Sequence, residues 1–339
     1  MVLGLWAFGT AIVSFAITAI VGRVLIPYLH KLNFGQTILD EGPSWHKGKQ
    51  GTPTMGGIMF IIGITITTVV AVILQAVFTT GFSSIEKFVF VGLAMALCQG
   101  AVGFIDDYIK VVKKRNLGLT ASQKLIMQVS IAVVYLVMMR LLCKDSTAIA
   151  IPFVGEVDLG FFYYIIMTLV IVGFVNAVNL TDGIDGLDAS ITFFVALFMM
   201  LIATIFQFGG TVVFSSAVAG GCLGFLIWNF HPAKVFMGDT GSLFLGGIIC
   251  AIAFSMDMQL IMIIVGLVYI IEMFSVMLQV MYFKYTKKKY GKGKRIFKMT
   301  PIHHHFEMCG WKENKIVIVF SLVTFLLGVG SLALIILSK

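Results

Sequence analysis

The feature that most constrains this chain is a series of ten apolar runs, most of them long enough to form a helix that crosses a membrane. A spanning helix needs about 20 predominantly apolar residues. The 339 residues are 59% hydrophobic and only 12% charged, whereas soluble domains carry about 25% charged residues. The composition therefore excludes a soluble globular protein, and continuous runs argue against an outer-membrane barrel. The predicted fold is an all-α integral membrane protein with a single polytopic domain over residues 1–339. The predicted spans are 3–27, 56–78, 87–105, 122–143, 161–178, 189–208, 211–229, 242–256, 260–283 and 315–338.

Lys and Arg are distributed unevenly between the connections. All 24 of them except Lys87, Arg140, Lys144 and Lys339 fall on the side that follows the odd-numbered runs. Because cytoplasmic connections carry the excess of Lys and Arg, this side is predicted to be cytoplasmic and both termini to lie outside. The net charge of +8 then reflects topology, and no nucleic-acid partner is expected. The outer connections are short, apart from a predicted turn or hairpin at 145–160.

The cytoplasmic connections hold nearly all of the Gly-rich, acidic and His-containing sequence. We therefore predict an active-site cleft on the cytoplasmic face. The connections are 28–55, 106–121, 179–188, 230–241 and 284–314.

The first acidic element is the pair Asp106 and Asp107, in GFIDDYIK. The pair is predicted to lie at the C-terminal end of the third helix, where the helix dipole disfavours anions. Adjacent carboxylates also repel each other, so a cation or a basic partner is expected beside them. The alternative is a solvated helix end neutralised by Lys110, Lys113 and Lys114.

The second acidic element is NLTDGIDGLD, which contains Asn179, Asp182, Gly183, Asp185 and Asp188. Glycine permits tight turns and a close approach of the backbone to a ligand, and free N–H groups at a helix start favour anions. The alternative for one of the aspartates is ordinary capping of the sixth helix.

The third acidic element runs from Asn229 to Ser242 and contains Phe236 and Asp239. Asp239 is predicted to precede the eighth helix, and N-capping is again the alternative. Phe236 beside a glycine provides a flat platform for a base or ring. Carboxylates from three connections on one face suggest a divalent cation, and oxygen ligands suit Mg²⁺ that bridges substrate phosphates.

Basic and histidine residues surround these elements. The Lys-rich segment 284–298 is expected to be attracted to anionic lipid. His303, His304 and His305 are consecutive, so they cannot all reach one metal, and hydrogen bonding to a phosphate or sugar is the better interpretation. Lys124 is either a phosphate contact or an interfacial anchor.

Two further segments attract attention. Lys49 and Thr54 precede the second helix, in a segment that reads by itself as a turn and a helix start. Glu272 is an acid inside the ninth predicted helix, and Gln279 lies seven residues on, hence on the same face. Because intramembrane acids are functional by default, this helix is predicted to line the cleft.

Together these residues describe a membrane-embedded site with aspartates, Mg²⁺, glycine-rich loops and basic neighbours. This combination fits phosphoryl transfer between a water-soluble phosphate donor and a lipid. A secondary transporter also uses intramembrane acids, but its acids lie near the midplane, and the outer face here has nothing comparable. A scaffold protein gives no reason for the clustered aspartates.

Five segments then carry a resemblance: GTPTMGG at 51–57, DDYIK at 106–110, NLTDGIDGLD at 179–188, FMGDTGSL at 236–243 and PIHHHFE at 301–307. They resemble the MraY family, the phospho-N-acetylmuramoyl-pentapeptide transferases, within the polyprenyl-phosphate N-acetylhexosamine-1-phosphate transferases. The resemblance implies transfer of phospho-MurNAc-pentapeptide from UDP-MurNAc-pentapeptide to undecaprenyl phosphate, which yields lipid I and UMP. It also implies Mg²⁺, the bacterial plasma membrane with its lipids, and a homodimer. A UDP-GlcNAc donor is the alternative within the same superfamily.

The resemblance also implies roles for individual residues. Asp239 would be the ligand of Mg²⁺, and Asp106, with Asp107 beside it, would be the base that deprotonates the lipid phosphate. The pocket for uridine and diphosphate would be formed by Asn179, Asp182, Gly183, Asp185, Asn229 and Phe236. Contacts to nucleotide, sugar or phosphate would come from Lys49, Thr54, His303, His304 and His305.

Overall fold

The structure, a computed structural model, describes residues 2–32, 49–78, 84–112, 118–143 and 146–338. Ten of its helices are long and apolar enough to cross a membrane, which confirms the predicted number of spans. These ten are α1 (Val2–Lys31), α2 (Gly57–Phe78), α3 (Ser84–Val112), α4 (Ala121–Leu142), α5 (Phe162–Thr181), α6 (Leu187–Ile205), α7 (Gly209–Asn229), α8 (Gly238–Ser255), α10 (Leu267–Tyr290) and α12 (Glu313–Ser338). The shorter elements are α9 (Gln259–Val265), α11 (Ile302–Glu307) and the strands β1 (Ala148–Ile151) and β2 (Gly155–Asp158).

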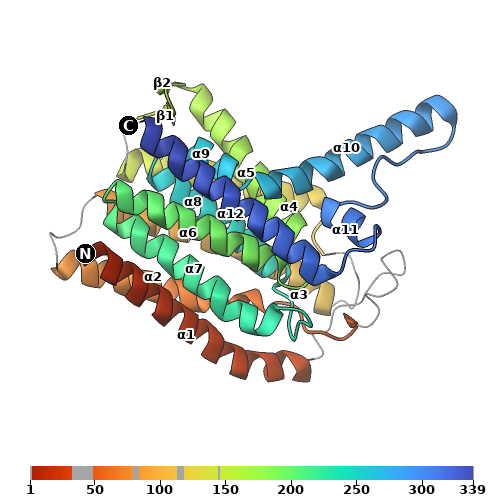
Figure 1. Cartoon of the computed structure of the whole chain (residues 1–339), viewed down its shortest axis with the longest axis horizontal. Helices are drawn as coiled ribbons and strands as arrows, with labels where there is room; N and C mark the ends of the chain where they lie inside the picture. The colour runs from red at the N-terminus through yellow and green to blue at the C-terminus, as the bar shows by residue number, and fades with distance from the viewer. Residues whose placement is uncertain (1, 33–48, 79–83, 113–117, 144–145, 339) are drawn as a thin grey trace.

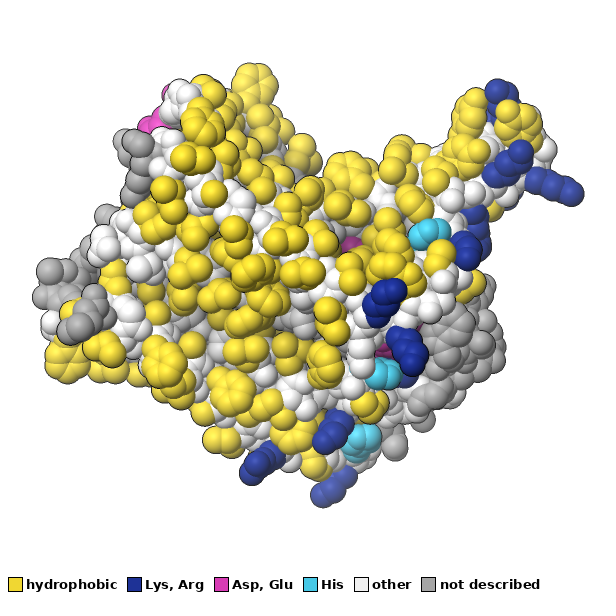
Figure 2. Space-filling view, in the orientation of Figure 1, with side chains coloured by type: hydrophobic (Ala, Val, Ile, Leu, Met, Phe, Trp, Pro, Cys, Tyr) yellow, Lys and Arg dark blue, Asp and Glu magenta, His cyan; other side chains and the backbone are white. Residues whose placement is uncertain are grey.

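Helices α7 and α8 form the centre of the bundle. In their most apolar stretches 83% and 89% of the residues are buried, against 28% in α1, α4 and α10. Helix α8 packs mainly on α3 and α5, and α7 packs mainly on α1 and α6. The outer helices turn exposed apolar side chains outward, and these cover most of the face seen in Figure 2. Such a surface suits contact with lipid rather than water.

The two ends of the bundle differ in kind. Both termini and the β1–β2 hairpin lie at one end, while α11 and the tip of α10 lie at the other (Figure 1). The antiparallel pairing of Ala148 with Asp158 and of Ile151 with Gly155 confirms the hairpin predicted within 145–160. Most of the Lys and Arg side chains visible in Figure 2 gather at the end that carries α11. The bundle is therefore polarised as the charge distribution predicts.

Several helix boundaries differ from the prediction. Helix α3 continues to Val112, so Asp106 and Asp107 lie inside the helix and not at its C-terminal end. Helix α8 begins at Gly238, so Asp239 lies in its first turn and not before it. The apolar content of a run marks the part of a helix in lipid, whereas hydrogen bonding continues through polar residues in the headgroup region, which explains both differences. Helix α8 therefore includes residues of the loop that precedes the predicted run 242–256.

The run predicted at 260–283 is divided. Helix α9 ends before Gly266, α10 then begins at Leu267, and it continues past the apolar run to Tyr290. Gly291, with φ of 72°, closes α10 in the left-handed conformation that glycine favours. The second half of α10 projects from the bundle (Figure 1) and carries part of the Lys-rich segment.

Candidate functional site

Three aspartates from two helices form one cluster at the end of the bundle that carries α11. Oxygen atoms of Asp106, Asp107 and Asp239 all lie within 4.8 Å of one another. They meet because α3 and α8 cross closely at Gly103. A Cβ atom on Gly103 would lie 2.6 Å from the backbone nitrogen of Thr240 and closer still to the Asp239 carbonyl oxygen. Only a residue without a side chain fits at this crossing. We call these three residues the aspartate cluster.

Two lysines neutralise the aspartate cluster. The Lys110 ammonium lies 2.6 Å from Asp106 Oδ2 and 3.0 Å from Asp239 Oδ2. The Lys124 ammonium lies 3.1 Å from the same Asp239 oxygen and donates to Asn179 Oδ1 at 3.3 Å. Lys124 is therefore a member of the site and not only an anchor at the membrane surface. Both are point charges with several donors, which suits contact with phosphate.

The three aspartates differ in their other partners. Asp107 accepts hydrogen bonds from the backbone N–H groups of Asp239 (3.2 Å) and Thr240 (2.9 Å), and from the Thr240 hydroxyl (2.7 Å). It thus ties α3 to the positive N-terminal end of α8. Asp106 accepts the Leu119 N–H at 2.7 Å. Asp239 accepts from Asn179 Nδ2 at 2.8 Å and is the most exposed of the three, with 20% of its side chain accessible.

The cluster is not an ordinary solvated helix end. Asp106 and Asp107 are buried, with 4% and 3% exposure, and Lys110 alone contacts all three aspartates within 4.0 Å. Lys113 and Lys114, which the alternative interpretation also invoked, lie outside the described residues. Asp106 and Asp107 are thus buried carboxylates that pair with a lysine, and not charges at a helix end exposed to solvent.

The turn between α5 and α6 connects the aspartate cluster to a second cluster, which is formed by Lys49, Asp185, His231 and Glu313. Burial and then the nearby carboxylates of Asp188, Asp239, Asp107 and Asp185 raise the pKa of Asp182 well above its usual value. In the described structure, none of the aspartates of this turn caps α6. The N-cap residue of α6 is Gly186, and no side chain forms a capping hydrogen bond at that position.

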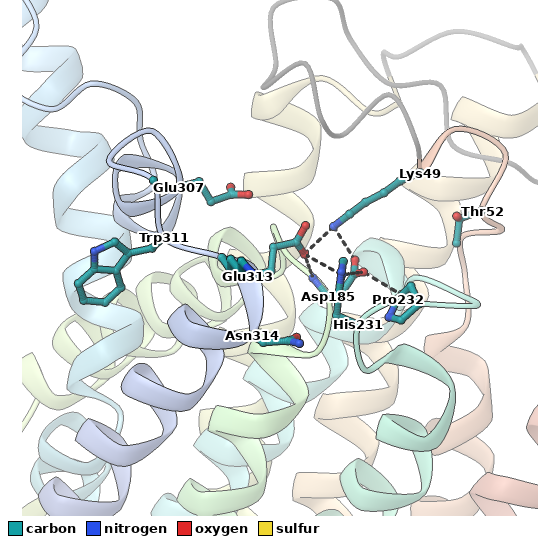
Figure 3. A pocket seen from close by; sticks show the side chains of 12 residues that line it. Lys49, Thr52, Asp185, His231, Pro232, Glu307, Trp311, Glu313 and Asn314 are labelled. Carbon is teal, nitrogen blue, oxygen red and sulfur yellow. Dashed lines mark hydrogen bonds and ion pairs between the residues drawn. The ribbon is translucent and has the colours of Figure 1, made fainter.

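A pocket lies at the other end of this turn (Figure 3). Its volume is about 600 Å³. The Lys49 ammonium lies 2.7 Å from Asp185 Oδ1 and 2.6 Å from Glu313 Oε2, and His231 Nδ1 lies 2.9 Å from Asp185 Oδ2. The pocket lining includes Lys49, Thr52, Asp185, His231, Pro232, Trp311, Glu313 and Asn314. Most of the described lining side chains are charged or polar, and Trp311 is the one aromatic carbocycle among them. Convergent polar groups of this kind can fix the orientation of a polar small molecule.

Two loops pair with each other next to the aspartate cluster. The Phe236 N–H donates to Pro53 O and its carbonyl accepts from Gly56, both at 2.8 Å, so the 49–57 and 235–238 segments lie side by side. Thr54 lies near Asp107, because a Cβ on Gly238 would meet both side chains. Asn229 is buried and fixes backbone: its side chain accepts from Gly186 N at 3.0 Å and donates to Val235 O at 2.9 Å.

The residues of α10 and α11 are brought near the site through different contacts. Glu272 and His303 are fully buried and lie 3.1 Å apart (Oε1 to Nδ1). Gln279 accepts from the N–H groups of Ile296 and Phe297 and donates to the Phe297 carbonyl. The hydrogen bonds described for Gln279 thus hold the backbone that follows α10.

The other two histidines of the triplet diverge. His304 Nδ1 lies 2.6 Å from Glu307 Oε2. His305 Nδ1 accepts from the Lys298 N–H at 3.1 Å, and the His305 ring packs edge-on against Phe297. Their partners differ from that of His303, as expected for consecutive residues of a helix.

The donor set of the aspartate cluster fits a Mg²⁺ ion. Hard divalent cations take oxygen ligands and often keep several waters, and Asp106 and Asp239 offer carboxylate oxygens that face Lys110. The carboxylate of Asp107 is engaged by α8. Asp185, His231 and Glu313 form another group of suitable spacing, in which Lys49 pairs with both carboxylates as Lys110 pairs with Asp106 and Asp239.

Sequence reasoning did not place Lys110, His231 or Glu313 among the site residues. Lys110 lies one helical turn after Asp106, a spacing that pairs opposite charges on a helix, so this signal was available. Glu313 begins the last spanning helix, far in sequence from Lys49, and no local pattern connects the two.

Comparison with known proteins first gives the class. Residues 89–257, which include the aspartate cluster and the α5–α6 turn, match the family model of glycosyl transferase family 4. The matched segment thus places this polytopic membrane protein in that class of transferases.

More specific matches then give the family. Residues 49–61 match signature 1 of phospho-N-acetylmuramoyl-pentapeptide-transferase. Proteins of that name from Bacillus pumilus (strain SAFR-032) and Bacillus subtilis (strain 168) are 48% and 47% identical to this chain, over 94% of it and 95% of each relative. One from Acetivibrio thermocellus is 48% identical over 93% of this chain and 91% of its own length. This chain belongs to the phospho-N-acetylmuramoyl-pentapeptide-transferase family.

Proposed function

We propose that this protein transfers phospho-MurNAc-pentapeptide from UDP-MurNAc-pentapeptide to undecaprenyl phosphate, with lipid I and UMP as products. The observation that carries the proposal is the aspartate cluster with Lys110 and Lys124, at one end of a ten-span bundle that belongs to this family. Phosphoryl transfer depends chiefly on positioning and on neutralisation of phosphate charge. A site that opens at the end of a membrane bundle can receive a soluble donor and a lipid acceptor together.

The donor is assigned to the space between the two clusters. The pocket of Figure 3 has the size and the lining for a nucleoside, with Trp311 on one wall and Asp185 and Lys49 as polar groups. The α5–α6 turn leads from this pocket to the aspartate cluster. The diphosphate would then reach Lys110 and Lys124, because these ammonium groups face Asp239.

Mg²⁺ is the proposed cofactor, held by Asp239 with Asp106 nearby. When bound, it would neutralise the diphosphate and stabilise the departing phosphate. The protein's own residues supply the rest: Lys110 and Lys124 orient phosphate oxygens, Asn179 holds Asp239, and Asp107 keeps α8 in place against α3.

The proposed reaction is a direct displacement. An oxygen of the undecaprenyl phosphate attacks the β-phosphorus of the donor, and the bond from that phosphorus to the bridging oxygen breaks, so that UMP leaves with the bond's electron pair. A proton on the acceptor phosphate would pass to the carboxylate of Asp106. The competing route makes an aspartyl-phosphate intermediate first.

The remaining assignments follow from charge and from the family. We propose that the end carrying α11 faces the cytoplasm of a bacterial plasma membrane, since the Lys and Arg excess lies there. Both termini would then lie outside. A homodimer is proposed on the family resemblance alone.

The decisive experiment measures UMP release by the detergent-purified protein with undecaprenyl phosphate and Mg²⁺. UDP-MurNAc-pentapeptide and UDP-GlcNAc are supplied in parallel reactions, each with and without EDTA. The expected result is EDTA-sensitive release from the muramyl donor only. Release from UDP-GlcNAc instead would reassign the donor, and no release from either by folded protein would reject the transferase function.

A further inference from the structure

Glu272 of α10 and His303 of α11 form a buried pair that the proposed chemistry does not use. Both side chains have 0% exposure. The carboxylate contacts His303 twice: the ring Nδ1 at 3.1 Å and the backbone N–H at 3.4 Å. An unpaired buried carboxylate is costly, and acids within membrane spans are rare outside functional sites. The pair therefore fixes both the ring of His303 and the start of α11.

The opposite edge of the His303 ring lies against the α5–α6 turn. Its Nε2 atom is buried and has no hydrogen-bond partner among the residues that the structure describes. A Cβ on Gly183 would lie 2.7 Å from His303 Cε1 and closer still to Nε2. The turn thus packs directly against the imidazole of His303 at Gly183. A side chain at position 183 would displace either the turn or the imidazole ring.

This turn carries groups of both clusters. Asp185 lies in the pocket beside Lys49, and the N–H of Gly186 is held by Asn229. Asp182 lies close enough to Asp239 to be influenced by its charge. A shift of the turn would consequently move donor-binding groups on both sides of it.

We propose that Glu272 is a positioning residue that acts through His303 to hold the Asp182–Asp185 turn in its binding geometry. This rests on the proposed function, and it assigns Glu272 a role without contact to substrate. The carboxylate accepts the Nδ1–H of the imidazole, which sets the tautomer and the direction of the ring. The imidazole then supports Gly183 by direct packing.

The proposal has a kinetic consequence that general destabilisation lacks. Because the turn lines the donor pocket, Glu272→Gln and Glu272→Ala should raise the KM for the UDP-linked donor, with the KM for undecaprenyl phosphate unchanged. Loss of the hydrogen-bonding partner that orients a metal-ligating histidine costs about 10- to 100-fold. By analogy, we expect kcat/KM for the donor to fall by about 10- to 100-fold. Glu272→Gln keeps a hydrogen-bond acceptor and should fall less than Glu272→Ala.

The matched control is Ser275→Ala, a buried polar residue on the same helix that donates to the Glu272 backbone carbonyl at 2.6 Å. This variant loses a buried hydrogen bond but leaves the Glu272 side chain intact. Its donor KM should equal that of the wild type. An equal rise in donor KM in Ser275→Ala would mean that any damage to α10 has this effect, and the positioning role would be rejected.

A double-mutant cycle tests the route of the effect. If Glu272 acts only through His303, then Glu272→Ala should change the donor KM little in a His303→Ala background. An undiminished effect in that background would overturn the proposal. The contact between Gly183 and His303 is tested by thermal unfolding. Gly183→Ala should lower the Tm when it is introduced into the wild type. It should lower the Tm much less when it is introduced into His303→Ala, because the alanine at position 303 leaves room for the new methyl group. Equal losses would refute the packing contact.

Failure of the proposed function is distinguishable from failure of this inference. A wild-type protein that releases no UMP rejects the function and, with it, the kinetic role of Glu272. The Tm cycle between Gly183 and His303 needs no substrate and still decides whether the two residues are coupled. Normal UMP release together with additive kinetic effects rejects only the inference.

Discussion

The crossing of α3 and α8 at Gly103 gives the most direct test of how this fold makes its site. In Gly103→Ala, the new Cβ would lie 2.6 Å from the Thr240 nitrogen and closer still to the Asp239 carbonyl. Ordinary contacts of a Cβ begin near 3.4 Å. The two helices must therefore separate by about 1 Å, and a misplacement of this size can cost about 100-fold in rate.

The separation would act directly on the aspartate cluster. Asp106 and Asp107 follow Gly103 on α3, whereas Asp239 lies on α8, so their mutual distances change when the helices part. We expect kcat/KM for UMP release to fall about 100-fold, with a ten-span bundle that still purifies as a folded protein.

Gly173→Ala on α5 is the matched control. It is also a glycine of a spanning helix, but apart from the adjacent residues and backbone of its own helix, no atom of the described residues lies within 4 Å of the place that its Cβ would occupy. Activity should therefore equal that of the wild type. Gly103→Ala with activity within about twofold of this control would refute the reasoning that the close helix crossing sets the cluster geometry, since the expected loss is about 100-fold.

Three further predictions concern the aspartates themselves. Asp239→Asn should abolish Mg²⁺-dependent UMP release while the far-UV circular dichroism spectrum stays that of a helical protein; unchanged turnover would remove Asp239 from the site. With labelled donor and no acceptor, no phosphosugar should be trapped on Asp106 or Asp107, and recovery of such an adduct by mass spectrometry would disprove direct displacement. The pKa of Asp182 is higher in the folded protein than in the unfolded chain. The contribution of this carboxyl group to the stability of the fold is therefore complete below its unfolded pKa and is lost as the pH rises through its folded pKa. In EDTA, Asp182→Asn should therefore have a higher Tm than the wild type at pH 8, and this difference in Tm should be smaller at pH 4. A Tm difference that stays constant between pH 4 and pH 8 would contradict the raised pKa of Asp182.

The sequence patterns identified many of the residues that the structure brings together, because these residues lie in short motifs. Asp106, Asp107 and Asp239 do form one cluster, and Lys124 and Asn179 join it. Asp185 and Lys49 share a pocket, as their assignment to nucleotide binding requires. Their substrate contacts stay predictions.

Other residues took roles that a linear pattern does not reveal. The shared helix face of Glu272 and Gln279 suggested that both line the cleft, but the contacts described for them go to His303 and to the backbone of 296–297. Helical periodicity says which residues share a face, not which segment packs against that face. Glu313 and Lys49 are 264 residues apart, so only the assembled bundle brings their charges together.

The sequence by itself determined the ten spans, the side that carries the basic residues and the set of motifs, because lipid demands long apolar runs and leaves polar residues to the ends. The tertiary structure alone decided which carboxylates meet, which lysines neutralise them and which histidine packs against the turn. These depend on close contacts between helices that are distant in sequence. The close crossing of α3 and α8 at Gly103 fixes the contacts within the aspartate cluster. The apolar pattern along each helix does not specify where two helices cross.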